Sequence, residues 1–397
     1  MSQPSRVLVS AFGDAGHVFP ALALSRRLRE RGHEVWVETL ERWRDIAEER
    51  DLRFVPAPER IVLHTPPPDG PAVPTLAESA GALVPLLREV RPDVVVNEVF
   101  SQPALLAAEL EGLPRATLVH HPYPQSARGL PYAYVGLVAP RTPLGEVGWR
   151  IAHPWFARHA RRDREELNEV RAELGLAPLD RLYGGISDQL AMIATFPQLE
   201  YPRSWPAHVH VTGPMLFELP HPEVDLPEGD DPLVLVAGST AQDRELFLVR
   251  AALQALASEP VRALVVLNQR GLDWSEPVPR NATVVDWASY SQVMPRASLV
   301  VCNGGHGTVA RALVAGVPLV VSPAGGDMRE NAARVAWTGA GMMVPRPLLG
   351  ARSLRWAVRR VLADPSFSSR ARALADWARD NDGAARGAEL VEGRAGE

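Results

Sequence analysis

One of two short segments that could do chemistry is Gly13–Pro20, which contains Gly16-His17. It follows the apolar stretch Arg6–Ser10, which predicts a buried strand, and precedes a helix predicted over Phe19–Arg31. Ligands bind at the carboxyl ends of parallel strands, so His17 is expected to border a cleft. The positive end of the helix dipole would lower the pKa of His17 and keep it neutral, as a general base requires. A capping or turn-filling role for His17 stays equally open on this segment alone.

The second segment is Asn303–Thr308, with the sequence Asn-Gly-Gly-His-Gly-Thr, between a predicted strand over Leu299–Cys302 and a helix over Thr308–Ala315. Its glycines bare backbone N–H groups at a helix N-terminus, which suits a diphosphate. Asp327 and Asn331 follow the next predicted strand, and Trp287 follows the strand over Thr283–Val285. An indole at a strand end could stack on a flat base. An ordinary glycine-rich turn and a core tryptophan are the alternatives.

Other phosphate-binding patterns fit less well. Gly13-x-x-Gly16 lacks the Gly-x-Gly-x-x-Gly spacing of a dinucleotide turn, although Glu38 could imitate its ribose-binding acid. No Gly-Lys-Ser/Thr is present. His120-His121 could suggest a metal, but no third ligand stands at fixed spacing, so polar strand-end residues are the simpler interpretation.

Taken together, these residues resemble a known family. The series Trp287, Asn303–Thr308, Asp327 and Asn331 resembles the donor signature of family-1 glycosyltransferases, and Gly16-His17-x-x-Pro20 resembles their catalytic-histidine turn. The resemblance implies an α/β protein of GT-B fold, with two Rossmann-like domains facing across a cleft and a C-terminal helical tail. It also implies an inverting transfer that uses a nucleoside-diphosphate sugar as co-substrate, with no metal and no other cofactor.

The resemblance also implies roles for individual residues. His17 would be the base that deprotonates the acceptor hydroxyl, and Glu98 would orient it where the family usually has aspartate. The implied donor-binding residues are Trp287, Asn303, Gly305, His306, Gly307, Thr308, Asp327, Ser239 and Thr240. The aromatic content of the N-terminal loops predicts a flat, lipophilic acceptor contacted by Phe19, Phe100, Tyr132 and Trp149.

Two positions depart from the family pattern. Asn303 stands where histidine is common, so a neutral amide would replace an imidazole at the phosphate. Met328 stands where glutamine or glutamate usually grips sugar hydroxyls, and a thioether cannot donate a hydrogen bond. A hydroxyl buried against it would lose about 1–3 kcal/mol, which favours a deoxysugar donor.

The elements that must position these residues alternate as strands and helices. Three units are predicted: an acceptor-binding domain over 1–215, a linker over 216–232, and a donor-binding domain over 233–397 whose tail helix could pack back on the first domain. Long loops are predicted over Pro56–Pro74 and Pro122–Pro154. The remaining predicted strands are Glu34–Leu40, Val94–Val96, Ala116–His120, Ala191–Phe196, Val209–Thr212, Leu233–Ala237, Ala263–Leu267 and Leu319–Val321, and the remaining predicted helices are Arg244–Ala257, Arg329–Trp337 and the tail from Ser353.

Composition limits the possible partners. The 397 residues include 42 basic and 47 acidic side chains, a net charge of −5 that offers no electrostatic footprint for nucleic acid. No apolar run is long enough to cross a membrane, and the single cysteine, Cys302, is expected to be buried and inert. We therefore expect a cytoplasmic enzyme whose partners are a small-molecule acceptor and a nucleotide sugar. The oligomeric state stays open, a homodimer included. The alternative functions are a nucleotide-sugar 2-epimerase and a catalytically silent GT-B partner of another enzyme.

Overall fold

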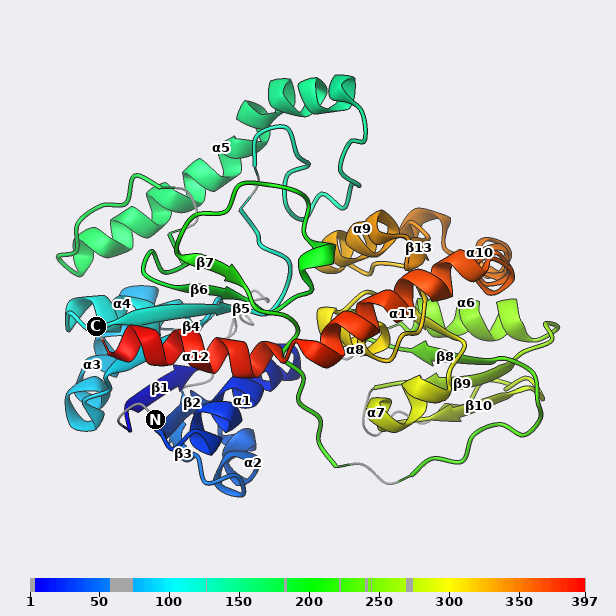
Figure 1. The fold of residues 1–397 in the computed structure, drawn as a ribbon, viewed down its shortest axis with the longest axis horizontal. Helices are drawn as coiled ribbons and strands as arrows, with labels where there is room; N and C mark the ends of the chain where they lie inside the picture. The colour runs from blue at the N-terminus through cyan, green and yellow to red at the C-terminus, as the bar shows by residue number, and fades with distance from the viewer. Residues whose placement is uncertain are drawn as a thin grey trace.

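The computed structural model describes residues 4–57, 74–125, 127–181, 184–220, 223–239, 242–243, 245–268 and 274–396. Thr240 and most of the loop predicted over Pro56–Pro74 lie outside these ranges. The described part is built on two parallel sheets, each covered by helices (Figure 1). The predicted α/β class with two Rossmann-like domains is confirmed.

The first sheet has seven parallel strands in the order β3-β2-β1-β4-β5-β6-β7. Its central strands are almost entirely buried because helices cover both faces, as in doubly wound folds. The strands are β1 (Arg6–Ser10), β2 (Glu34–Thr39), β3 (Arg53–Pro56), β4 (Val94–Glu98), β5 (Arg115–Val119), β6 (Ala191–Ile193) and β7 (Val209–Val211). The order reverses between β1 and β4, and ligands of such sheets bind at this switch point.

The helices of the first half differ from the prediction in two places: the first helix begins at Ala15, four residues before the predicted Phe19, and another helix begins inside a predicted loop. They are α1 (Ala15–Glu30), α2 (Arg44–Glu48), α3 (Leu76–Val90), α4 (Gln102–Leu110) and α5 (Pro143–Glu173), with short 3-10 turns η1 (Glu41–Trp43) and η2 (Pro197–Leu199). The loop predicted over Pro122–Pro154 is wrong from Pro143 onward, where α5 begins. Thr142 caps this helix by accepting from the Gly145 N–H at 3.3 Å, and proline suits its first turn. Leu144, Ile151 and Trp155 are 72–82% exposed, so no apolar inward stripe marked this stretch as a helix.

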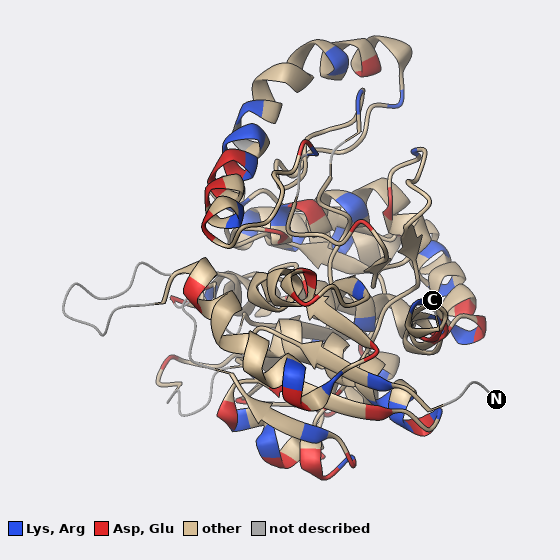
Figure 2. Ribbon diagram, turned by 90° about the vertical axis from the view of Figure 1, so that its left-hand side faces the viewer, with Lys and Arg blue, Asp and Glu red and all other residues tan. Residues whose placement is uncertain are grey.

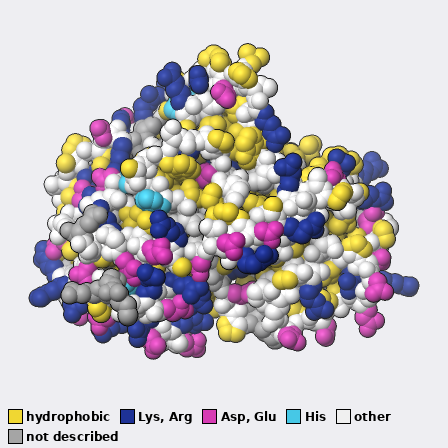
Figure 3. Space-filling view, in the orientation of Figure 1, with side chains coloured by type: hydrophobic (Ala, Val, Ile, Leu, Met, Phe, Trp, Pro, Cys, Tyr) yellow, Lys and Arg dark blue, Asp and Glu magenta, His cyan; other side chains and the backbone are white. Residues whose placement is uncertain are grey.

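Helix α5 forms the upper edge of the molecule. Hydrophobic side chains lie at this edge in the space-filling view (Figure 3). Acidic and basic residues are interspersed along α5 and over the neighbouring elements (Figure 2). Among the described residues, no helix is both long and apolar enough to cross a membrane.

The second sheet repeats the arrangement with six parallel strands in the order β10-β9-β8-β11-β12-β13. These strands are β8 (Leu233–Ala237), β9 (Arg262–Val266), β10 (Ala282–Val285), β11 (Leu299–Cys302), β12 (Leu319–Val321) and β13 (Gly341–Met343). Around them lie α6 (Phe247–Leu256), α7 (Tyr290–Val293), η3 (Met294–Arg296), α8 (His306–Val314), α9 (Met328–Thr338), η4 (Arg346–Leu348), α10 (Ala351–Ala363), α11 (Pro365–Asp380) and α12 (Gly383–Ala395). The switch point of this sheet lies between β8 and β11. Cys302 ends β11, is 1% exposed, and burial raises the pKa of its thiol to about 12, as expected for an inert core cysteine.

The C-terminal helix returns to the first half of the chain (Figure 1). Ala384, Ala388 and Val391 of α12 belong to the hydrophobic core around α1. A Cβ on Gly383 would lie 2.3 Å from the Gly213 carbonyl oxygen, so only glycine fits where the tail crosses the strand-to-linker turn. The two sheets are thus joined by this crossing as well as by the linker.

Candidate active site

The switch point of the first sheet brings His17 and Glu98 together. His17 lies in the first turn of α1, directly after β1, and Glu98 is the last residue of the neighbouring strand β4. His17 Nδ1 is 3.1 Å from Glu98 Oε1. The Glu98 side chain is fully buried, and that of His17 is 11% exposed. The longer arm of glutamate therefore reaches the imidazole, as the sequence-based interpretation required.

A second imidazole, which the sequence analysis did not assign to the site, contacts the same carboxylate. His120 Nδ1 is 2.9 Å from Glu98 Oε1. Leu118 pairs with Glu98 in the register of β4 and β5, and side chains two residues apart share a face, so His120 lies on the Glu98 side. The signal was present: His120 follows the strand that neighbours β4.

The ring nitrogens can be assigned because a carboxylate only accepts hydrogen bonds. Both imidazoles donate from Nδ1 to Oε1 of Glu98, while the backbone N–H of Phe100 donates to Oε2 at 3.3 Å. Burial alone would raise the pKa of Glu98, but the two imidazoles hold it well below its ordinary value. Glu98 is therefore an ionised carboxylate at neutral pH.

The same environment sets the two histidine pKa values in opposite directions. Burial works against the charged form of His17, but the charge and hydrogen bond of Glu98, aided by Asp14 and Asp327, raise its pKa above the ordinary value. The prediction that the helix dipole lowers the pKa of His17 is therefore wrong, since the buried carboxylate outweighs the dipole. Burial and the nearby charge of His17 lower the pKa of His120 to about 3.

These three residues also form the one group in the described ranges that could hold a metal ion. One ligand atom from each of His17, Glu98 and His120 lies within 4.8 Å of the others. Two imidazoles and a carboxylate are a ligand set found in zinc enzymes. In this structure the same atoms are engaged in the two hydrogen bonds to Glu98.

The switch point of the second sheet carries the predicted glycine-rich segment. Helix α8 begins at His306, two residues earlier than predicted, with Gly305 as its N-cap. Gly305, Gly307 and Thr308 are partly exposed at this helix start, where backbone N–H groups lack helical partners. The arrangement can bind an anion such as a diphosphate.

Asn303 and His306 are less available than their neighbours. The Asn303 amide nitrogen lies 3.4 Å from Asp243 Oδ2, within the second half of the chain. His306 is buried, its Nε2 lies 3.2 Å from the Ala194 carbonyl oxygen, and its Nδ1 lies 3.2 Å from Asn331 Oδ1. The His306 ring therefore bridges α8 to the end of β6 in the first half.

The other predicted donor residues lie at the same carboxyl edge of the second sheet. Asp327 is the N-cap of α9 and accepts from the Asn331 amide at 3.1 Å. Ser239 follows β8 and accepts from the Gln242 N–H at 3.0 Å. Trp287 is partly buried just after β10. These residues thus follow strands of the second sheet at the edge where α8 begins, and Thr240 lies outside the described ranges.

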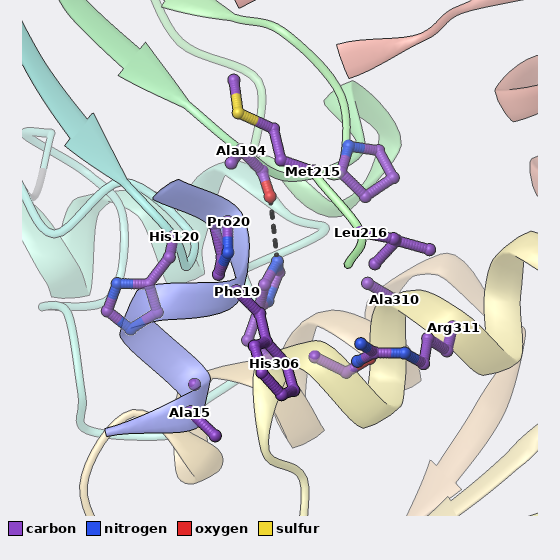
Figure 4. Close-up of a pocket in the computed structure, with 13 residues that line it drawn as sticks. Ala15, Phe19, Pro20, His120, Ala194, Met215, Leu216, His306, Ala310 and Arg311 are labelled. Carbon is purple, nitrogen blue, oxygen red and sulfur yellow. Dashed lines mark hydrogen bonds between the residues drawn. The ribbon is translucent and has the colours of Figure 1, made fainter. Parts of the chain in front are cut away.

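A cavity that is open to solvent, with about 350 Å³ of empty space, lies between the two halves (Figure 4). The lining residues include Gly16, Phe19 and Pro20 of α1, His120 and Ala194 directly after β5 and β6, Pro214–Leu216 between β7 and β8, and His306, Gly307 and Arg311 of α8. Arg311 also lies 5.9 Å from the Phe19 ring centroid. The histidine side of the site and the start of α8 therefore face a common space.

The four predicted acceptor residues separate into two groups. Phe100 lies next to the base, with its ring centroid 4.9 Å from that of His17, and Phe19 lines the cavity. Tyr132 and Trp149 instead pack on Phe156 of α5, at 5.9 and 5.7 Å between ring centroids. The structure does not place this second pair beside His17.

A further aromatic residue, Tyr134, lies near both halves of the site. Its hydroxyl is 3.4 Å from His121 Nε2, and the charges of Asp327 and Glu98 help burial to raise the pKa of its phenol. Its φ of 67° is in the left-handed region, which non-glycine residues rarely adopt. Such strain often marks functional positions, but a single sequence gives no sign of it.

Comparisons with known proteins identify relatives of this chain. Two family models match the chain: the Erythromycin biosynthesis protein CIII-like C-terminal domain over residues 250–390, and the Glycosyltransferase family 28 N-terminal domain over residues 7–120. The chain is 30% identical over 422 residues to 4'-demethylrebeccamycin synthase of Lentzea aerocolonigenes, covering 98% of this chain and 99% of the relative. It is also 30% identical over 436 residues to O-mycaminosyltylonolide 6-deoxyallosyltransferase of Streptomyces fradiae, covering 98% and 97%.

Solved structures show the same fold at lower sequence identity. CalG4, the calicheamicin glycosyltransferase, aligns with a TM-score of 0.77 and 23% identity over 100% of this chain and 99% of that one. Glycosyltransferase VinC in complex with dTDP aligns with a TM-score of 0.71 and 19% identity over 98% and 99%.

Proposed function

Because this chain belongs to the bacterial family-1 glycosyltransferases of GT-B fold, we propose that it moves a sugar from a UDP- or dTDP-sugar to a hydroxyl of a lipophilic natural product. We propose further that the transfer inverts the anomeric carbon and needs no metal ion. The observation that carries the proposal is the buried His17–Glu98 pair. Its neighbours Gly16 and His120 line the same cavity as His306 and Gly307 at the start of α8.

The chemistry follows from the assigned nitrogens. His17 donates from Nδ1 to Glu98, so its Nε2 can accept the proton of the acceptor hydroxyl. As that proton moves, the hydroxyl oxygen forms a bond to the anomeric carbon, and the bond from that carbon to the diphosphate oxygen breaks. The nucleoside diphosphate leaves with the electron pair. A single displacement of this kind inverts the anomeric configuration.

Each half of the site stabilises the charge that develops next to it. The ionised Glu98 stabilises the imidazolium that forms on His17, as the acid of a catalytic triad does. The N–H groups and the dipole at the start of α8 stabilise the diphosphate that leaves. The carboxylate of Asp327 can accept hydrogen bonds from sugar hydroxyls.

The acceptor class is supported by residues and by relatives. Phe100 presents an apolar ring beside the base, and Phe19 presents one to the cavity. The relatives' names concern rebeccamycin and tylonolide compounds, which supports a natural-product acceptor for this chain as well. One relative is a 6-deoxyallosyltransferase, which agrees with the deoxysugar donor that Met328 predicts.

Metal independence and location complete the proposal. Glu98 already holds the Nδ1 atoms of His17 and His120 by hydrogen bonds, so the base needs no ion to be oriented. We propose that the enzyme works in the cytoplasm, in keeping with its single buried cysteine.

The proposal can be tested with purified protein and a panel of UDP- and dTDP-sugars. Lipophilic phenols and alcohols serve as acceptors, and the release of nucleoside diphosphate is measured with and without EDTA. The expected result is acceptor-dependent release that EDTA does not reduce, with a product of inverted anomeric configuration by NMR. Epimerised nucleotide sugar without glycoside, or no turnover of any pair, would contradict it.

A further inference from the structure

The cluster of two histidines on one carboxylate contains more than the base needs. His17 and His120 both donate to the same oxygen of Glu98, at 3.1 and 2.9 Å. Orienting the base requires only the first of these bonds. The side chain of His120 is buried as deeply as that of His17, at 7% and 11% exposure respectively.

Both rings direct unprotonated nitrogens away from Glu98. Because Nδ1 carries the hydrogen in each ring, Nε2 of each neutral ring has a lone pair. Within the described ranges, neither Nε2 has a hydrogen-bonding partner in the protein. The ring centroids lie 4.2 Å apart, and His120 lines the cavity between the two halves (Figure 4).

We propose that His120 is a second acceptor-binding residue, whose Nε2 accepts a hydrogen bond from a donor group next to the reacting hydroxyl. The inference rests on the proposed function. It narrows the substrate class to acceptors that carry two neighbouring donors, such as a catechol or a vicinal diol. One hydroxyl meets His17 and reacts, and the other meets His120 and stays intact.

The different environments of the two rings explain why His17 acts as the base and His120 only accepts a hydrogen bond. The pKa of His17 is raised by Glu98, so His17 can take up a proton when the bond forms. The pKa of His120 is lowered to about 3, so this ring accepts a hydrogen bond without becoming protonated. Two titratable groups whose surroundings push their pKa values apart commonly take different roles in one reaction.

An acceptor with a single hydroxyl would leave Nε2 of His120 facing the ligand without a partner. A site built to hydrogen-bond a hydroxyl discriminates strongly against analogues that lack it. His120 borders the cavity rather than being sealed from it, so we expect the lower part of the usual range, about five- to twentyfold in affinity.

Three naphthols test this inference by calorimetric binding to the full chain with UDP or dTDP present. In 2,3-dihydroxynaphthalene the hydroxyls are neighbours, and in 2,7-dihydroxynaphthalene they are equal in number but far apart. The third probe, 3-methoxy-2-naphthol, keeps the shape of the first and lacks one donor. Wild type should bind the 2,3 isomer about five- to twentyfold more tightly than the other two.

Variants separate recognition from support of Glu98. In His120→Phe the three naphthols should bind within about twofold of one another, whereas a merely structural role would weaken all three equally and keep the preference. His120→Gln supplies an amide donor for Glu98 and a carbonyl acceptor, and should restore part of the preference. The matched control is His121→Phe. In the wild type the His121 ring donates to the Pro122 carbonyl oxygen at 2.8 Å and not to Glu98, so this variant should keep the preference for the 2,3 isomer.

The inference is overturned if wild type binds the 2,3 isomer no more tightly than the 2,7 isomer, or if the preference survives in His120→Phe. The wild-type comparison decides the matter even if His120→Phe fails to fold. A binding preference without any sugar transfer would instead contradict the proposed function.

Discussion

Replacing Glu98 by Gln changes one atom at a carboxylate that serves three donors. Oε1 accepts from His17 and His120, and Oε2 accepts from the backbone N–H of Phe100. If the Gln carbonyl takes the place of Oε1, its NH₂ group faces the Phe100 N–H. If the amide turns over, its NH₂ group faces two imidazole nitrogens, which must then give up their hydrogens. In either arrangement the NH₂ group faces another hydrogen-bond donor, and the hydrogen bond that sets the His17 tautomer is disturbed.

The rate effect can be estimated from both consequences. A misplaced or wrongly protonated general base costs roughly 10²–10⁴-fold, and the loss of the orienting acid in a catalytic triad costs roughly 10⁴-fold. We therefore expect kcat/KM of Glu98→Gln to fall about 10²–10⁴-fold at pH 8. The affinity for UDP or dTDP should remain nearly unchanged. Glu98 belongs to the first sheet, whereas the proposed diphosphate site at the start of α8 follows a strand of the second sheet.

The pH dependence has a definite sign. The acidic limb of kcat/KM reports the base of the free enzyme, and the pKa of His17 is raised above 6.5 by Glu98. Without the carboxylate, burial dominates and lowers the pKa of His17, so the limb should move to lower pH. The defect of the variant should therefore be smaller at pH 6, where the wild-type base is largely protonated, than at pH 8.

Release of nucleoside diphosphate between pH 5.5 and 9 measures both effects. The control is Glu111→Gln, which removes a carboxylate that pairs with Arg88 near the surface at an N–O distance of 3.0 Å. This variant should leave the pH profile of kcat/KM unchanged. A limb that stays in place or moves to higher pH, or a loss below tenfold, would refute the assignment of Glu98.

The remaining predictions concern the base, the nucleotide and the sugar. His17→Ala should lower transfer to alcohols roughly 10²–10⁴-fold with donor affinity retained, and normal turnover would assign the base elsewhere. Trp287→Ala should raise the dissociation constant of UDP or dTDP roughly five- to a hundredfold, and Thr308→Val should also weaken binding. Unchanged calorimetric affinity in both variants would move the donor site. Met328→Gln should raise the use of UDP-glucose relative to a dTDP-deoxysugar, and a wild type that already prefers UDP-glucose would contradict the deoxysugar proposal.

The strands and the residues at their carboxyl ends could be predicted because their signals are local. Uniformly apolar runs marked β1, β8 and β11 within a residue of their observed bounds. The glycine-rich starts of α1 and α8 followed directly from those strands. Since parallel strands end at one edge, the sequence could also place Trp287 and the start of α8 at the same edge of the second sheet, whereas the pairing of His17 with Glu98 came from the family resemblance.

Other features could not be predicted because they depend on packing between distant segments. The first part of α5 exposes Leu144, Ile151 and Trp155, so it lacks the inward apolar stripe that reveals a helix. The predicted direction of the His17 pKa shift was wrong for a similar reason. The helix dipole is visible in the sequence, whereas the buried Glu98 carboxylate contributes only after β1 and β4 pair.

The relative position of the two sheets decides whether the base and the start of α8 act on one substrate, and buried polar contacts fix that position. Arg334 of α9 reaches Glu200 of the first half at 3.1 Å and Glu330 at 2.7 Å, all nearly inaccessible to solvent. His306 adds its contact to Ala194. A buried ion pair costs desolvation to form, and breaking it leaves an uncompensated charge that costs several kcal/mol, so such contacts specify one arrangement more than they add stability. His306 and Arg334 thus hold the second half, which carries the start of α8, against the first half. Their partners in the first half, Ala194 and Glu200, lie more than a hundred residues away in the sequence, which is why motif reasoning could identify both ends of the site without predicting how they meet.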